Sequence, residues 1–178
     1  MSFLRWDEQR ASEIAKEALN NLRINEVSFQ INLGMIDKAL DLLGPSLLVQ
    51  IGTSQNEIDK FLFIYNLASA QAWLEFIRNV SASYRVGFDN LGMAIEAGGL
   101  TLAQIGTNEV ELQKLRIKGC KASAKFYTTV IREGRESDIH LKGFKERLFT
   151  EMREGNLSAI DIGLTQVEVS KYSQDLLA

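Results

Sequence analysis

Few residues in this chain are of the types that carry acid–base, nucleophilic or metal chemistry. Its 178 residues include one histidine, His140, and one cysteine, Cys120. A helical di-metal site needs Glu-x-x-His pairs, which the chain lacks, and a lone thiol in an apolar helical stretch is expected to be buried and inert. Neither a GxGxxG nor a GxxxxGK phosphate-binding signature occurs. We therefore expect no cofactor, no metal ion and no enzymatic activity.

The clearest chemical pattern is a row of basic residues, which we call the basic ridge. Its members are Lys114, Lys118, Lys121, Lys125 and Arg132. Spacings of 4, 3, 4 and 7 residues place them on one side of an α-helix. The segment from Lys114 to Arg153 holds 11 basic and 5 acidic residues, although the whole chain has a net charge of −3. The ridge predicts binding of an acidic protein, with nucleic acid or anionic lipid as alternatives, and it is also typical of a solvated helix face without a partner.

A twelve-residue phrase occurs three times. It reads QIGTSQNEIDKF from Gln50, QIGTNEVELQKL from Gln104 and DIGLTQVEVSKY from Asp161. Each copy places a capping residue three positions before a glutamate, the pattern that closes the amino end of a helix. The predicted caps are Ser54 with Glu57, Asn108 with Glu111, and Thr165 with Glu168. A glycine two residues before each cap permits a positive φ, so each phrase predicts a corner between two helices.

The third corner, LSAIDIGLTQVEVSKY, resembles the DNA-binding helix-turn-helix motif. The resemblance lies in the spacing of Ala159, Gly163, Val169 and Tyr172. It implies that Gly163 makes the turn and that the recognition helix carries Thr165, Gln166, Glu168, Ser170 and Lys171. A DNA-binding regulator is therefore the alternative function.

A second resemblance involves Arg135 and His140. They form an Arg-x4-His pair similar to the motif of the all-helical ribonucleases of the HEPN family. In that family the arginine and the histidine serve RNA cleavage in a dimer cleft. The resemblance implies ribonuclease activity as a remote alternative, while a surface histidine without a chemical role explains the same residue.

The elements that position these residues follow from the repeat. Residues 50–83 and 104–137 align without a gap and share 12 of 34 positions, far more than chance gives. Long helices are expected at about 55–82 and 109–134, the first apolar nearly all round and therefore buried. Shorter helices are expected at about 33–43, 89–97 and 144–154, and a closing helix at 166–176. The alternating residues at 24–33, 83–88 and 138–144 predict extended linkers or short strands.

The chain as a whole predicts an all-α fold of stacked helical-hairpin repeats, arranged as an α-α superhelix or a bundle. We expect a single domain, residues 1–178, with repeats at about 1–52 (partial), 53–106 and 107–163, closed by a helix in 164–178. Ala11-Ser12, 57 residues before Ala68-Ser69, suggests the partial copy. The 14 uncharged residues 61–74 are too few to span a membrane.

The function expected from this architecture is non-enzymatic protein interaction, as an adaptor, scaffold or regulatory module. The partner would be an acidic protein or a second copy of the chain, and nucleic acid is the weaker candidate. A lone cysteine and an amino terminus without signal-peptide features favour the cytoplasm.

Overall fold

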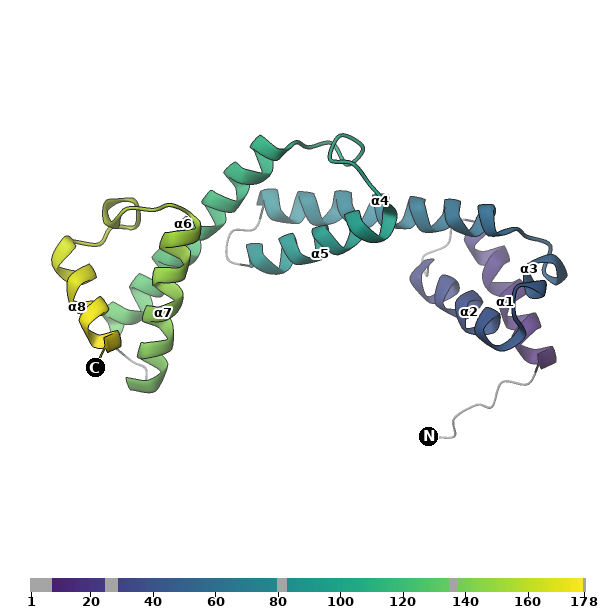
Figure 1. Ribbon diagram of the computed structural model, residues 1–178, viewed down its shortest axis with the longest axis horizontal. Helices are drawn as coiled ribbons and strands as arrows, with labels where there is room; N and C mark the ends of the chain where they lie inside the picture. The colour runs from purple at the N-terminus through teal and green to yellow at the C-terminus, as the bar shows by residue number, and fades with distance from the viewer. Residues whose placement is uncertain (1–7, 25–28, 80–82, 135–137, 178) are drawn as a thin grey trace. The chain divides into compact units, whose positions relative to one another are not determined.

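The computed structural model describes residues 8–24, 29–79, 83–134 and 138–177, and every regular element in these ranges is helical (Figure 1). In chain order the elements are α1 (Glu8–Ile24), α2 (Phe29–Leu43), α3 (Ser46–Gln50), α4 (Gln55–Asn79), α5 (Tyr84–Gly98), α6 (Glu109–Glu133), α7 (Asp138–Glu154), the 3₁₀ helix η1 (Ala159–Ile162) and α8 (Gln166–Leu177). Three hairpins form, in which α1 packs on α2, α4 on α5 and α6 on α7. The predicted all-α fold of helical hairpins is confirmed.

The second helix of each hairpin begins earlier than predicted. Helices α2, α5 and α7 begin at Phe29, Tyr84 and Asp138, so the described parts of the segments expected to be linkers or strands are helical. The prediction is wrong because the short alternation of apolar and polar residues also fits the start of a helix, and the longer stretch around it follows the helical period. In α5 the buried positions 84, 87, 91 and 94 follow steps of three and four residues, which is the period of a helix.

The chain divides into two compact units. Unit 1 comprises residues 1–69 and 94–99, and unit 2 comprises residues 70–93 and 100–178. The boundary falls within both α4 and α5 and not between two hairpins. Ile58, in the first half of α4, belongs to the core formed with α1, α2 and α3, whereas Phe76 and Ile77, in its second half, lie against Gly87 of α5. The expected single domain and its repeat boundaries stay predictions.

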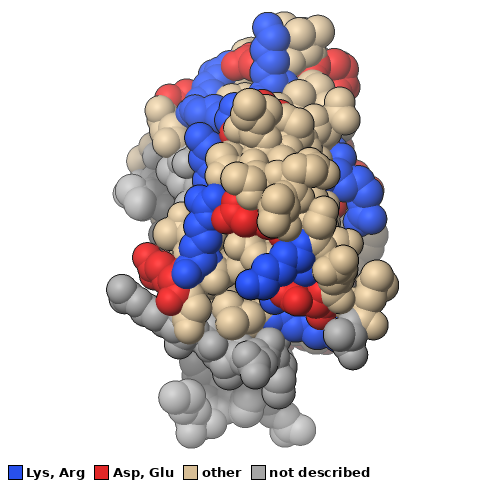
Figure 2. Space-filling view, turned by 90° about the vertical axis from the view of Figure 1, so that its left-hand side faces the viewer, with Lys and Arg blue, Asp and Glu red and all other residues tan. Residues whose placement is uncertain are grey.

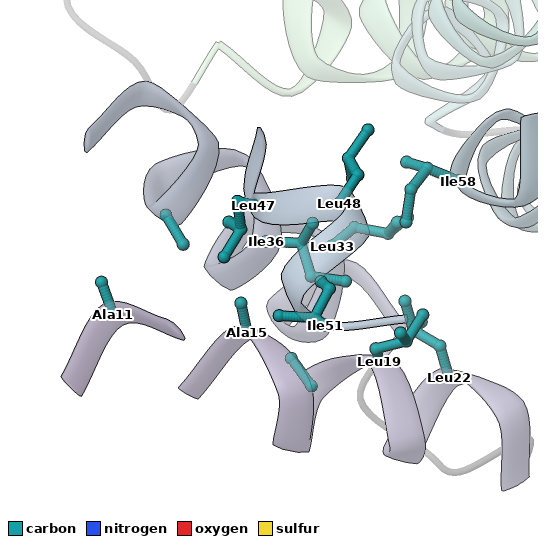
Figure 3. Close-up of a cluster of buried hydrophobic side chains, with 12 residues drawn as sticks. Ala11, Ala15, Leu19, Leu22, Leu33, Ile36, Leu47, Leu48, Ile51 and Ile58 are labelled. Atoms are coloured by element: carbon teal, nitrogen blue, oxygen red, sulfur yellow. The ribbon is translucent and has the colours of Figure 1, made fainter. Parts of the chain in front are cut away.

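The core of unit 1 lies between α1, α2 and the corner that follows them. Figure 3 shows small side chains of α1, such as Ala11 and Ala15, opposite Ile36 and Leu47. Alanines on one face of α1 let the helices approach closely, and the larger aliphatic side chains fill the remaining space. Ile51, the residue before the corner glycine, is buried in the same cluster.

The core of unit 2 repeats this arrangement around α6, α7, η1 and α8. The cluster of buried residues around these four helices is made of Ala124, Ile131, Leu148, Ile162, Leu164 and Tyr172. Ile162 again precedes a corner glycine, and Tyr172 comes from the helix after the corner. Each of these two hairpins is therefore closed by the first turns of the next helix, which adds its apolar residues to the core.

The amino-terminal hairpin follows the same register as the others. Ala15, Ala70 and Ala124 are all fully buried, and each lies nine residues before the last residue of its helix, α1, α4 or α6. The offset between the first two is 55 residues, two fewer than the match of Ala11-Ser12 with Ala68-Ser69 suggests. A dipeptide of small residues recurs too easily in helices to define a register.

Helix α4 is not buried all round, contrary to the prediction from its composition. Phe63 and Ile64 are 37% and 52% exposed, because only one stripe of the helix faces each core. Among the residues that the structure describes, no helix is both long and apolar enough to cross a membrane.

Candidate functional site: the corners and the basic ridge

An arginine near the end of the first helix of a hairpin holds the corner that follows the second helix. In unit 1, Arg23 of α1 donates from Nε to Glu57 Oε1 at 2.8 Å and from Nη2 to Glu57 Oε2 at 2.9 Å. Its Nη2 also donates to the carbonyl oxygen of Gly52 at 2.9 Å. The planar guanidinium matches both acceptors, a geometry that lysine cannot reproduce. We call this contact the arginine lock.

The lock recurs at both corners of unit 2. Its members there are Arg78 with Gly106 and Glu111, and Arg132 with Gly163 and Glu168. In both copies Nε lies 2.9 Å from the glutamate carboxylate, and Nη2 lies 3.1 and 2.8 Å from the two glycine carbonyl oxygens. Sequence reasoning missed the lock, although identical Ile-Arg pairs near the ends of the two long helices were a signal for it.

Each lock glutamate is also the third residue of a helix amino terminus. At the first corner Ser54 Oγ accepts from the Glu57 N–H at 3.3 Å, and Thr53 Oγ1 donates to the Glu57 carboxylate at 2.7 Å. The second corner has the same two bonds, at 2.9 and 2.8 Å, from Asn108, Thr107 and Glu111. One glutamate therefore joins the cap of the new helix to the arginine of an earlier one.

The third corner has a different residue directly after its glycine. Leu164 replaces the threonine and is buried, and the carboxylate of Glu168 bonds to Thr165 instead. Thr165 donates from its N–H at 2.8 Å and from Oγ1 at 2.9 Å, and its Oγ1 accepts from the Glu168 N–H at 3.2 Å. This corner therefore has both bonds of a capping box.

Hydrogen bonding at the corners stabilises the ionised glutamates. The pKa of Glu57 falls to about 2, because first its arginine partner and then the Thr53 hydroxyl donate hydrogen bonds to the carboxylate. The pKa of Glu168 also falls to about 2, again with the arginine as the largest cause. The pKa of Glu111 is lowered as well, where the Thr107 hydroxyl has the largest effect. Donors to a carboxylate favour its charged form.

Part of the basic ridge is used by the fold. Arg132 belongs to the third lock. Lys118 Nζ donates to the carbonyl oxygen of Arg78 at 3.1 Å, which places a positive charge at the carboxyl end of α4, where it is favourable. Lys121 Nζ lies 3.7 Å from Asp161 of η1.

The remaining ridge residues face solvent. Lys114 and Lys125 are exposed, and neither side chain has a hydrogen-bond or ion-pair partner among the residues that the structure describes. Val110 and Ile117, on the neighbouring strip of α6, are 64% and 36% exposed. An exposed strip of α6 thus combines unpaired positive charge with apolar surface.

The excess of basic residues in the segment 114–153 is offset by later acidic residues. The ion pairs are Lys121 with Asp161, Arg132 with Glu168, and Lys145 with Asp175. Residues 100–178 together hold 12 basic and 11 acidic residues. Figure 2 shows the result at the end of the molecule that carries α8, where Lys and Arg are interspersed with Asp and Glu around an uncharged area. The surface is mixed in charge, not a continuous basic field.

A buried polar cluster joins α5, α6 and α7. Glu151 is 2% exposed. Its carboxylate accepts from Tyr84 Oη at 2.6 Å and from Arg85 Nε at 3.1 Å. Tyr84 Oη also lies 3.2 Å from the sulfur of Cys120. Burial is the largest cause of the raised pKa of both Tyr84 and Cys120, so the phenol and the thiol stay protonated at neutral pH.

This cluster holds helices together and leaves no reactive group free. Arg85 also donates to Glu154 at 2.7 Å, so its guanidinium is shared between two carboxylates. An open pocket of about 180 Å³ beside it is lined by Arg85, Tyr127, Arg147, Thr150 and Glu151. Sequence reasoning missed the cluster, because Tyr84 was assigned to a linker and the repeats have no second Tyr–Glu pair at these positions.

The corner that resembles a helix-turn-helix has the geometry of the other corners. Gly163 has a φ of 75°, close to the 76° and 82° of Gly52 and Gly106. The element before it is a 3₁₀ helix of four residues, where the DNA-binding motif has an α-helix. Glu168 is held by the lock, whereas Gln166, Ser170 and Lys171 are exposed on α8.

The structure describes only one residue of the predicted Arg-x4-His pair. His140 lies in the first turn of α7 and is exposed, and Arg135 lies outside the described residues. Within the described residues, no group of three or more His, Cys, Asp or Glu side chains could hold a metal ion.

The corners and the exposed strip of α6 are therefore the candidate functional features among the described residues. The corners recur with the repeat, whereas the complete exposed strip is present on α6 and not at the aligned positions of α4. In comparisons with known proteins, no family model, no curated protein and no solved structure matches this chain.

Proposed function

We propose that this chain is a non-enzymatic protein-interaction module that binds an acidic segment of another protein along α6. The observation that carries the proposal is the exposed strip of this helix. Lys114 and Lys125 face solvent there beside Val110 and Ile117. Lysines without internal partners supply charge complementarity, and the neighbouring aliphatic side chains supply apolar contact area.

An acidic protein fits this strip better than a nucleic acid does. Binding to a phosphate backbone depends on many basic residues that neutralise it together. Residues 100–178 have nearly equal numbers of basic and acidic residues, and three ridge residues already contact other parts of the fold. A short acidic segment needs only the few lysines that remain.

The test is a pull-down from native lysate with partners identified by mass spectrometry. Lys114→Glu with Lys125→Glu reverses the two unpaired charges, and Lys142→Glu with Arg153→Glu makes an equal charge change on α7 as the matched control. We expect the first variant to lose an acidic partner that wild type and control retain, with binding at least tenfold weaker when measured with the purified partner. Equal retention by all three proteins would refute the proposal.

DNA binding through α8 is a second candidate, favoured by the exposed Gln166, Ser170 and Lys171. It predicts that the protein retards duplex DNA at low salt and that Lys171→Glu abolishes the retardation. Ribonuclease activity, the remote alternative, predicts RNA degradation that His140→Ala abolishes. Self-association stays a prediction that sedimentation of the purified protein tests.

A further inference from the structure

Two corners of unit 2 are followed by the same exposed pair of residues. Val110 and Lys114 lie in the first two turns of α6, and Val167 and Lys171 in the first two turns of α8. The members of each pair are four residues apart, and both pairs lie at the same distance from their corner glycine. The valines are 64% and 78% exposed, and both lysines are exposed. Residues four apart on a helix lie side by side, so each corner presents an apolar side chain next to a positive charge.

The fold explains the other residues that the repeated corner sequences share, but it does not explain the Val–Lys pair. The glycines, the glutamates and the buried isoleucines form the locks and the core. Neither valine nor lysine takes part in a lock or a cap. A β-branched residue on the exposed face of a helix is a slightly unfavourable choice for the helix itself. Packing therefore does not explain why the same pair stands at two corners.

We propose that these two Val–Lys pairs are equivalent docking sites for an acidic polypeptide, each receiving one apolar side chain on the valine and one carboxylate on the lysine. This inference rests on the proposed function and specifies its partner. The site on α8 is an open patch of the helix surface formed by Gln166, Val167, Ser170, Lys171 and Gln174. Lys171 is the only ionised residue of this patch, and Asp175, one turn further along α8, is close enough to interact with it electrostatically.

The first corner provides the contrast. The same positions of α4 lie on an open patch of the helix surface formed by Asn56, Asp59, Lys60, Phe63 and Ile64. Here asparagine replaces the valine, and the carboxylate of Asp59 stands beside Lys60. An acidic ligand would meet a like charge at this corner, which disfavours it. Lys60 also stands beside the exposed Phe63 and Ile64, so what distinguishes the second and third corners is the valine four residues before the lysine.

Two sites of the same kind suit a partner with two acidic motifs on one chain. Once one motif binds, the second binds at a high effective concentration, so affinity rises without any new type of contact. The probe is a synthetic peptide with one leucine flanked by glutamates, compared with a peptide that carries two such motifs on a Gly/Ser linker. Fluorescence anisotropy with the full chain measures both. We expect the two-motif peptide to bind at least tenfold tighter.

Two of the variants place asparagine, the residue at position 56 of the first corner, at the equivalent positions of the second and third corners. Val110→Asn and Val167→Asn should each weaken the two-motif peptide about fivefold, and Lys171→Glu should weaken it about tenfold. Lys60→Glu, at the first corner, is the matched control and should leave binding unchanged. Asparagine is already present at this position in α4, so the variants are expected to fold, which circular dichroism checks.

The outcomes separate this inference from the proposed function. Loss of peptide binding on changing either Val–Lys pair, with Lys60→Glu silent, supports the inference. Binding that depends on Lys114 and Lys125 but is unaffected by Val167→Asn and Lys171→Glu overturns it and leaves the function standing. No binding of either peptide by the wild type overturns both, and displacement of the peptide by duplex DNA in a Lys171-dependent way assigns α8 to nucleic acid.

Discussion

At the scale of single residues, the lock glutamates show how the chain uses charge. Each one accepts a hydrogen bond from a threonine at or next to the cap of its own helix and from an arginine 33 to 36 residues earlier in the chain. A partly exposed ion pair alone contributes little to stability. A guanidinium that binds both a carboxylate and a backbone carbonyl also fixes the direction in which the next helix leaves the corner.

The locks predict a loss of stability in acid. The pKa values of Glu57 and Glu168 lie at about 2, below the 4.5 of an ordinary glutamate. A carboxyl whose pKa is lowered by folding stabilises the protein fully above its unfolded pKa, and this contribution is lost as the pH falls through the folded value. We therefore expect the melting temperature to fall between about pH 5 and pH 2.

The variant that tests this replaces all three lock glutamates: Glu57→Gln, Glu111→Gln and Glu168→Gln. At neutral pH it should melt roughly 5 °C below wild type, and its melting temperature should depend much less on pH between 5 and 2. Glu17→Gln with Glu96→Gln removes exposed glutamates outside the corners and serves as the control. If the melting temperature of the triple variant falls as steeply between pH 5 and pH 2 as that of the wild type, the locks are not the source of the pH dependence.

At the scale of elements, the contact of α5 with α6 and α7 depends on the buried Tyr84 and Glu151. A glycine makes this contact possible, since a Cβ at Gly119 of α6 would overlap the ring of Tyr84. The hydroxyl of Tyr84 then reaches the carboxylate, 2.6 Å away. A buried carboxylate is tolerated only while its donors are in place.

Tyr84→Phe should therefore destabilise the protein by about 1–3 kcal/mol, because one oxygen of Glu151 loses its donor without any loss of ring packing. Denaturant unfolding measures the change, and a double-mutant cycle with Glu151→Gln separates the pair from its surroundings. Tyr127→Phe removes a hydroxyl from a half-buried ring of α6 and should cost less than about 1 kcal/mol. Equal destabilisation by Tyr84→Phe and Tyr127→Phe would mean that the buried hydrogen bond from Tyr84 to Glu151 adds no stability beyond that of an ordinary tyrosine hydroxyl.

The elements also show what the sequence could and could not predict. The ends of α4 and α6 and the closing helix α8 were predicted within a few residues, because caps and glycines act locally. The early starts of α2, α5 and α7 were missed, since short alternating stretches fit a strand as well as a helix. The locks and the Tyr84–Glu151 contact were missed because their partners are tens of residues apart and no local pattern links them. For the same reason Arg132 was assigned to a binding surface.

At the scale of the whole molecule, the boundary inside α4 explains how repeats of this kind depend on one another. A hairpin does not bury its core alone, and the first turns of the following helix complete it. Ile58 does so for α1 and α2, and Tyr172 does so for α6 and α7. Stability in such arrays is close to a sum of local contributions from each hairpin and its neighbour, so damage to one core should stay local.

Native-state hydrogen exchange tests this expectation with two matched substitutions. Leu19 and Leu148 are both fully buried, the first in unit 1 and the second in unit 2. Leu19→Ala should cost about 2–5 kcal/mol through the cavity that it leaves, and amides of α1 and α2 should lose that much protection while those of α6 and α7 keep theirs. Leu148→Ala should show the reverse pattern. If either substitution lowers protection equally in both units, the chain unfolds as one cooperative body and each core depends on more than its adjacent helix.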